Sequence, residues 1–234
     1  MSVPFTPYGP AHLGVFALTL AVPFGAAALT RGSGREWVAT SFRASFAAFI
    51  IAAWVFRLGL LMHRNWLSLV NILPMNLCDW ATIAVLVTLI RPHRQSYELA
   101  YFWALGGTLQ ALLTPDLAYG FPDPAFVVFF ALHGGVIASV LYLTLGLGMR
   151  PSLGSLPRVF AWSLVYLAVA LAVNAALGAN FGYLRAKPAE PSLLDALARW
   201  PFYILELVPL GIFLAFVFYA PFFLFDRIRR PGGQ

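Results

Sequence analysis

The sequence AFVVFFALHGGVIASVLYLTLGL, residues 125–147, contains no Asp, Glu, Lys or Arg over 23 residues. An α-helix of this length is about 35 Å long at 1.5 Å per residue, enough to cross the roughly 30 Å hydrocarbon core of a bilayer. In that core every backbone N–H and C=O needs an internal partner, which a helix supplies. The run is longer than a strand and does not alternate between apolar and polar residues, so it is not a barrel strand. Residues 125–147 therefore predict a transmembrane helix.

Similar apolar blocks occur along the whole chain. Of its 234 residues, 61% are hydrophobic and only 10% are charged, whereas about a quarter of a soluble domain is charged. The mean hydropathy of +0.80 leaves too little polar surface for a water-soluble protein of this size. Polar or proline-containing turns divide the blocks, and no internal repeat is evident. We predict an all-α, polytopic transmembrane bundle that forms one domain, residues 1–234, with seven spans: 11–29, 42–61, 72–90, 97–115, 125–147, 158–179 and 202–225.

The basic residues predict the orientation of this bundle. Lys and Arg favour the cytoplasmic side of a membrane. With seven spans, the ten Arg residues 31, 35, 43, 91, 94, 150, 158, 227, 229 and 230 lie on one side, and Arg57, Arg64, Arg185, Lys187 and Arg199 lie on the other. We therefore expect an outside N-terminus and a cytoplasmic C-terminus. The absence of Lys and Arg from residues 1–10 argues against a cleaved signal peptide, so we expect the first block to be a retained span.

The net charge of +6 does not indicate a nucleic-acid partner. The Arg residues stand singly or in small groups at the ends of apolar blocks, where they contact lipid headgroups and set topology. We expect membrane lipids as partners. The single cysteine, Cys78, excludes an intrachain disulfide. Metal-binding, phosphate-binding and hydrolase motifs are absent from the sequence, and its four His residues are scattered. We therefore predict no metal and no cofactor.

Polar side chains inside a membrane are costly, so their positions are informative. In the predicted topology they gather in the outer halves of spans three to seven. Three of them are ionisable groups of a predicted outer pocket: Asp79, His133 and Glu206. The other pocket residues are Asn76, Cys78, Gln110, Thr114, Asp116, Asn174, Asn180 and Tyr203.

Structural roles remain open for several of these residues. Asp79 and Glu206 lie near helix starts, where an acid interacts favourably with the helix dipole. His133, Gln110 and Asn174 could form hydrogen bonds between helices. Cys78 could be a small buried residue without reactivity.

Several stretches together resemble the YwaF-like family of bacterial integral membrane proteins. They are Leu73 to Trp80 (LPMNLCDW), Tyr101 to Leu117 (YFWALGGTLQALLTPDL), Phe130 to Gly134 (FALHG), Asn174 to Asn180, Pro191 to Asp195 (PSLLD) and Trp200 to Tyr203 (WPFY). The likeness covers roughly residues 70–225, and the GGTLQALLTPD run is its most specific part. It implies a multi-pass protein of a bacterial plasma or inner membrane.

This family is distantly similar to animal membrane enzymes that act on lipid acyl esters, a phospholipid acyltransferase and fatty-acid ester hydrolases among them. Those enzymes are thought to use a Thr or Cys nucleophile with a His. The resemblance implies that His133 is the base. Relatives usually have Leu-Pro-x-His or Asn-Pro-Cys-His in the third span. Here Met75 and Asn76 occupy the positions of Cys and His, and an Asn cannot shuttle protons near neutral pH.

Three functions remain as alternatives. The first is a lipid-directed acyltransferase or ester hydrolase, in which His133 activates Cys78, Thr108 or Thr114 and a carboxylate of Asp79 or Glu206 orients the imidazole. The second is a binding or transport protein whose polar pocket holds a small solute, a lipid headgroup or an ion. The third is an accessory membrane subunit.

Overall fold

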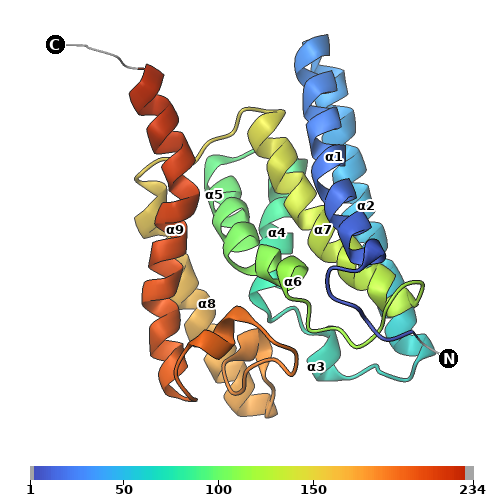
Figure 1. Cartoon of the computed structure of the whole chain (residues 1–234). Coiled ribbons are helices and arrows are strands. Elements are labelled where there is room, and N and C mark those ends of the chain that lie inside the picture. The colour runs from blue at the N-terminus through green and yellow to red at the C-terminus, as the bar shows by residue number, and fades with distance from the viewer. Residues whose placement is uncertain (1–2, 230–234) are drawn as a thin grey trace.

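The computed structural model describes residues 3–229, which form a bundle of helices (Figure 1). The principal helices are α1 (Pro10–Ser33), α2 (Glu36–His63), α4 (Leu77–Ile90), α5 (Arg94–Trp103), α6 (Leu109–Leu113), α7 (Pro124–Leu145), α8 (Ser155–Leu177) and α9 (Phe202–Arg229). Shorter elements are α3 (Leu69–Ile72), the π-helical turn η1 (Ala104–Thr108) and the 3₁₀ turns η2 (Phe181–Tyr183) and η3 (Leu193–Ala196). The predicted all-α bundle is confirmed.

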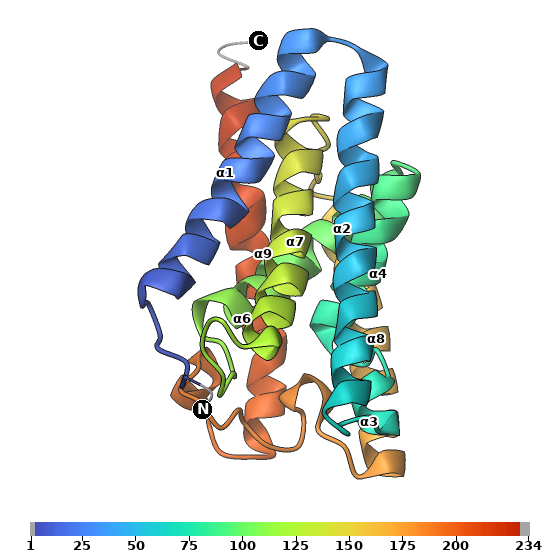
Figure 2. The same ribbon diagram turned by 90° about the vertical axis from the view of Figure 1, so that its right-hand side faces the viewer.

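Five helices among the described residues are long and apolar enough to cross a membrane: α1, α2, α7, α8 and α9. Their bounds reproduce five of the seven predicted spans, most closely for the predicted spans 125–147 and 202–225. The helices alternate in direction, as Figures 1 and 2 show. The N-terminal segment lies at the same end of the bundle as the loops α2–α4, α6–α7 and α8–α9. The α1–α2 loop and the end of α9 lie at the opposite end. Which end faces the cytoplasm stays a prediction.

The predicted third span, 72–90, is wrong at its start. Helix α4 begins only at Leu77 and has 14 residues, so it is about 21 Å long. The preceding helix α3 ends at Ile72, and Leu73 is extended because Pro74 disfavours the helical conformation in the residue before it. Helix α4 is therefore too short to cross the hydrocarbon core alone.

The predicted fourth span, 97–115, is a helix interrupted by a π-turn. Helix α5 starts earlier than predicted, at Arg94. It continues into η1, in which Leu109 N–H donates to the carbonyl of Ala104, five residues back. A π-turn of this kind contains one extra residue and is frequent at functional sites. It contains Gly106 and Gly107, and a Cβ on Gly107 would contact the Leu77 side chain at 3.0 Å. Glycine thus lets η1 lie close to the start of α4.

Helix α7 lies at the centre of the bundle (Figures 1 and 2). It packs against α1, α2 and α4, and α4 packs against α5. Two-thirds of the residues in the 18-residue apolar stretch of α7 are buried, whereas none are buried in the corresponding stretch of α9. The large apolar side chains on the outer faces, such as Leu18, Ile90 and Leu205, are exposed. This distribution suits a bundle that contacts lipid.

An ion pair joins the end of α2 to the start of α7. Arg64 Nη2 donates to both carboxylate oxygens of Asp123 at 2.8 Å. The Arg64 guanidinium also lies over the rings of Trp66 and Tyr119, at 4.9 and 5.2 Å from their centroids. Asp123 caps α7 by accepting a 2.7 Å hydrogen bond from Ala125 N–H. Burial acts to raise the pKa of Asp123, but the hydrogen bonds from Arg64 and Ala125 outweigh it and lower that pKa.

We expect Asp123→Asn to lower the free energy of unfolding by about 1 kcal/mol, because the amide can cap α7 but cannot form the ion pair. Asp123→Ala should cost about 2 kcal/mol because it removes both interactions. The folded pKa is depressed, so this stabilisation is present above the unfolded pKa of about 4 and is lost as the pH falls through the folded pKa. Thermal unfolding in detergent from pH 7 to pH 3 measures both effects.

The exposed carboxylate of Glu190 supplies the control. Glu190→Gln should leave the melting temperature and its pH dependence unchanged. Equal melting temperatures for wild type, Asp123→Asn and Asp123→Ala would contradict the assigned role of Asp123.

Candidate functional site

The start of α4 is fixed by Asn76 and Asp79. The Asp79 carboxylate accepts hydrogen bonds from the backbone N–H of Asn76 at 2.9 Å and from its side-chain amide at 3.2 Å. Asn76 Oδ1 in turn accepts a 3.1 Å hydrogen bond from Gly182 N–H in the α8–α9 loop. Asp79 thus has the role of a helix-start acid, and Asn76 connects α4 to a loop more than a hundred residues later.

Cys78 lies at the second position of α4 and is partly buried. The Thr108 hydroxyl lies beside its thiol. The first N–H groups of a helix have no acceptor within the helix, so they favour negative charge near them. The predicted nucleophile Cys78 therefore lies in the first turn of a helix, with the Thr108 hydroxyl as a neighbour of its thiol.

The Thr108 hydroxyl is buried and makes no hydrogen bond of good geometry within residues 3–229. Other helical hydroxyls donate to the carbonyl four residues earlier at 2.7 Å; these belong to Thr82, Thr88, Ser139 and Thr144. Thr108 closes the π-turn, in which the backbone register is shifted by one residue. We attribute its free hydroxyl to that shift.

Tyr166 of α8 completes the surroundings of Cys78. Its side chain is 7% exposed and contacts the indole of Trp80, with ring centroids 5.4 Å apart. Its hydroxyl lies near the backbone N–H of Leu77 and interacts electrostatically with Cys78 and Asp79. It has no hydrogen bond of good geometry in the described part of the chain. The large majority of buried side-chain polar atoms in proteins have such a partner, so two free hydroxyls near one thiol are unusual.

Arg57 of α2 brings a positive charge to the same region. Its Nη2 donates to the carbonyl of Asn71 at 2.7 Å, and its guanidinium lies 5.1 Å from the ring centroid of Trp54. It interacts electrostatically with Asp79 and with His133. Its Nη1 is buried and lacks a hydrogen-bond partner among the described residues.

His133 has a fixed tautomer in this structure. Its Nδ1 lies 2.7 Å from the carbonyl oxygen of Phe129, which can only accept, so Nδ1 carries the proton of the neutral ring. Nε2 then has a free lone pair, as a general base requires. The Phe129 ring stacks on the imidazole at 4.2 Å. No hydrogen bond between His133 and Cys78 is present among the described residues.

The expectation that Asp79 or Glu206 orients the imidazole is wrong. Asp79 accepts from Asn76, and Glu206 accepts a 2.8 Å hydrogen bond from Ala198 N–H. The Phe129 carbonyl holds His133 instead, because a carbonyl four residues earlier is the nearest acceptor on a helix. His12, which is 1% exposed, has partners on both nitrogens: Tyr8 N–H on Nδ1 and the Leu112 carbonyl on Nε2.

Four predicted pocket residues fold the α8–α9 loop. Asn174 pairs with both backbone polar groups of Phe181, at 2.7 and 2.9 Å. Asn180 Oδ1 accepts from the backbone N–H groups of residues 185 and 186. The Tyr203 hydroxyl donates to the carbonyl of Tyr183, and Glu206 holds Ala198 as described. These contacts assign the four side chains to the structure of this loop, which lies at the same end of the bundle as the start of α4 (Figure 1).

The remaining predicted residues lie at the end of α6. Thr114 donates its hydroxyl to the carbonyl of Gln110 at 3.1 Å. Asp116 accepts a 3.0 Å hydrogen bond from the hydroxyl of Tyr183. Burial, together with this neighbouring carboxylate, raises the pKa of Tyr183 above its usual value. Within residues 3–229 no three His, Cys, Asp or Glu side chains come together as a metal site would require.

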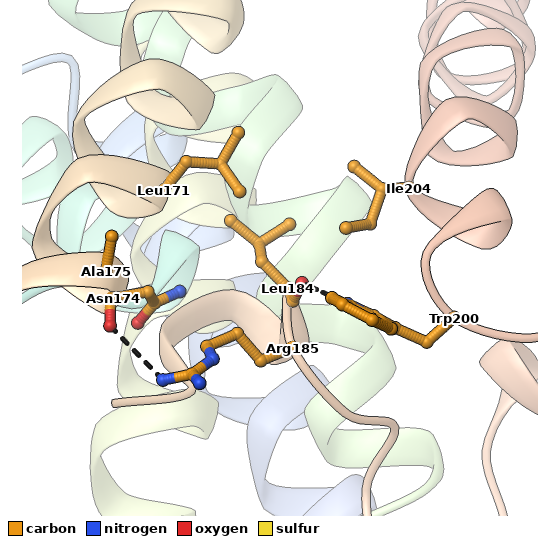
Figure 3. Close-up of a pocket in the computed structure, with 7 residues that line it drawn as sticks. All are labelled: Leu171, Asn174, Ala175, Leu184, Arg185, Trp200 and Ile204. Carbon is orange, nitrogen blue, oxygen red and sulfur yellow. Dashed lines mark hydrogen bonds between the residues drawn. The ribbon is translucent and has the colours of Figure 1, made fainter. Parts of the chain in front are cut away.

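A cavity of about 280 Å³ lies between α8 and the start of α9. Figure 3 shows Leu171, Asn174 and Ala175 of α8 on one side and Ile204 of α9 on the other, with Leu184, Arg185 and Trp200 of the connecting loop. Arg185 Nη1 donates to the carbonyl of Asn174, and Trp200 Nε1 donates to that of Leu184. Leu184 and Ile204 also pack with Tyr166 and Leu77. The cavity therefore shares one hydrophobic cluster with Leu77 and Tyr166, which lie near Cys78.

Sequence reasoning missed Arg57 and Tyr166 as members of the site. Arg57 had a detectable signal, since it lies inside an apolar stretch, where a charge marks function more often than not. Tyr166 had none, because an aromatic residue in an apolar helix is ordinary.

These features describe a multi-pass helical membrane protein with a polar cluster around one cysteine. The chain matches the TMEM164 family over residues 7–219, and it belongs to this family. It is also 30% identical over 178 residues to an uncharacterized protein of Treponema pallidum (strain Nichols), a match that covers 74% of this chain and 72% of the relative. No solved structure matches it.

The contact between Gly182 and Tyr166 can be tested directly. Gly182 has a φ of +65°, and a Cβ there would overlap the Tyr166 hydroxyl. We expect Gly182→Ala to lower the free energy of unfolding by more than the 1–2 kcal/mol that a left-handed conformation costs. Gly178 is the matched control, because its φ is +64° but a Cβ there has space.

Thermal unfolding of both variants measures the difference between them. Adding Tyr166→Phe to Gly182→Ala should recover part of the loss, because the phenyl ring lacks the overlapping oxygen. Equal destabilisation by Gly178→Ala and Gly182→Ala would contradict the close contact.

Proposed function

We propose that this protein is a membrane enzyme that transfers or hydrolyses the acyl groups of lipid esters through a thioester on Cys78. The observation that supports this most is the position of Cys78. The only thiol of the chain lies in the first turn of α4, partly buried, beside the free hydroxyl of Thr108. The resemblance of the sequence to enzymes acting on lipid acyl esters, set out above, points to the same chemistry.

The proposed reaction has two steps. The Cys78 thiol loses its proton to a base, for which we assign His133 Nε2, and the sulfur attacks the carbonyl carbon of the ester. The C–O bond to the alcohol breaks, and the proton from the base goes to the departing oxygen. A lipid hydroxyl or water then attacks the thioester and restores the thiol. His133 would move toward Cys78 when the substrate binds, since no hydrogen bond joins them in this structure.

The cavity between α8 and α9 supports a lipid as the substrate. Leu171, Leu184 and Ile204 give it apolar walls, and Arg185 gives it a positive charge. A lipid has the same two parts, an acyl chain and a polar headgroup. Leu184 and Ile204 of the cavity belong to the same hydrophobic cluster as Tyr166, so we propose that an acyl chain reaches Cys78 along this cluster.

Asn76 does not contribute a proton in this proposal. Its amide bridges Asp79 and Gly182, and an amide does not titrate near neutral pH. Relatives with His at this position would have a second base near the thiol. In this chain the proposal assigns proton transfer to His133.

Because the chain has one cysteine, the thioester can be detected without ambiguity. We expect the protein, incubated with vesicles of acyl-labelled phosphatidylcholine, to gain the mass of one acyl group by intact-protein mass spectrometry. Neutral hydroxylamine should remove it, and Cys78→Ala should abolish it. Cys78→Ser should give either no adduct or one that resists hydroxylamine. His133→Gln should slow its formation by 10²-fold or more.

Thr82→Val is the control for these variants, because it removes a hydroxyl that donates to the carbonyl of Cys78 without touching the thiol. A folded wild-type protein that forms no adduct and releases no fatty acid would refute the enzyme proposal.

A binding protein is the alternative, favoured by the free polar atoms of Arg57, Thr108 and Tyr166. Such a site could hold a lipid or a small polar ligand without covalent chemistry. A ligand-dependent rise in melting temperature that survives Cys78→Ala, with no thioester in the wild type, would indicate this function.

A further inference from the structure

We propose that the hydroxyls of Thr108 and Tyr166 form the oxyanion-binding site of this protein, receiving the carbonyl oxygen of the acyl group that Cys78 attacks. The inference rests on the proposed function and extends it to the two residues that stabilise the charge formed during the reaction. Neither residue belongs to the pocket that the sequence predicts.

The first support is the unmet hydrogen-bonding capacity of both hydroxyls. Thr108 is 1% exposed and Tyr166 is 7% exposed, and neither hydroxyl has a hydrogen bond of good geometry in the described chain. Leaving a buried donor unpaired is energetically unfavourable. A donor kept free at that cost is available to an acceptor that arrives with a substrate.

The second support is that two different elements bring these residues into the neighbourhood of the same thiol. Thr108 approaches Cys78 from η1, and Tyr166 approaches it from α8. Each is held close by a glycine. A Cβ at Gly107 would meet Leu77, and one at Gly182 would overlap the Tyr166 hydroxyl. Close contacts at two glycines thus bring the two hydroxyl-bearing elements close to the start of α4.

The third support is the end of α4 itself. Cys78 follows Leu77 at the start of the helix, where the first N–H groups have no intrahelical acceptor. A helix N-terminus favours an anion. Leu77 N–H faces the oxygen of the Tyr166 hydroxyl, so the O–H proton of Tyr166 stays available to an anion at this helix start.

The chemistry requires such donors. When the Cys78 sulfur bonds to the carbonyl carbon, the electron pair of the C=O double bond moves onto oxygen, which becomes negatively charged. Thr108 O–H and Tyr166 O–H would donate to this oxygen. When the C=O double bond forms again, the ester C–O bond breaks and the alcohol leaves with the proton that His133 received from the thiol. Preorganised donors of this kind are worth on the order of 10² to 10³ in rate each.

The experiment compares two reactions of Cys78 in the full-length protein. Acyl transfer from the labelled phosphatidylcholine vesicles forms an oxyanion, whereas alkylation by iodoacetamide does not. We expect Tyr166→Phe and Thr108→Val each to slow thioester formation by about 100-fold, with alkylation within a factor of about three of wild type. Thr108→Ser, which keeps a hydroxyl, should recover most of the rate.

The matched controls are Tyr97→Phe and Thr88→Val, whose hydroxyls already have partners in Thr144 and Ala84. Both should acylate at the wild-type rate. If Tyr166→Phe does not fold, as its melting temperature will show, Thr108→Val and Thr108→Ser decide the question.

Two outcomes would overturn this inference. One is an unchanged acylation rate in the folded variants. The other is an equal loss of acylation and alkylation, which would place the effect on the thiol itself. A wild-type protein that forms no thioester would instead refute the proposed function, so the two failures are distinguishable.

Discussion

The structure depends on the late start of helix α4. Pro74 prevents the helical conformation at Leu73, and Asn76 with Asp79 starts α4 only at Leu77. With 14 residues, α4 is about 10 Å shorter than the hydrocarbon core is thick. Unpaired N–H groups at membrane depth are tolerated only where protein surrounds them. The α8–α9 loop, η1 and α2 supply these surroundings, and this is why segments distant in sequence meet at Cys78.

On the neighbouring helix, the π-turn leaves a polar group without its usual hydrogen-bond partner. Helical Ser and Thr hydroxyls often donate a hydrogen bond to the backbone carbonyl four residues earlier, as those of Thr82 and Thr88 do. Thr108 lacks that bond at the point where the helix register changes. Two adjacent helices therefore each contain a local irregularity, the late start of α4 and the π-turn with the free hydroxyl of Thr108, and both lie near the single thiol. Irregular backbone inside a membrane is typical of functional sites.

The fold could be predicted from the apolar runs because their length follows directly from the thickness of a bilayer. That argument succeeded for α7 and α8, which are uninterrupted. It overestimated the length of the third span. Leu73 and Met75 are apolar and extend the hydrophobic run, but Pro74 prevents them from continuing the helix. The site was only partly predictable. Cys78, Asp79 and Asn76 share one motif, but the hydrogen-bond partners of His133 and Asn174 depend on three-dimensional contacts. Sequence position suggested that Glu206 faces a pocket, whereas its carboxylate holds Ala198.

The contacts of Asn76 give a physical reason for an amide at this position. Asn76 must donate to Asp79 and accept from Gly182 at the same time, through two atoms of one planar group. A neutral imidazole also has one donor and one acceptor, but they lie farther apart and on a larger ring. A His here could keep one of these contacts at neutral pH and would lose its acceptor when protonated, releasing Gly182. Asn does not titrate, so it keeps both contacts without a change in its own charge and holds the α8–α9 loop to the start of α4.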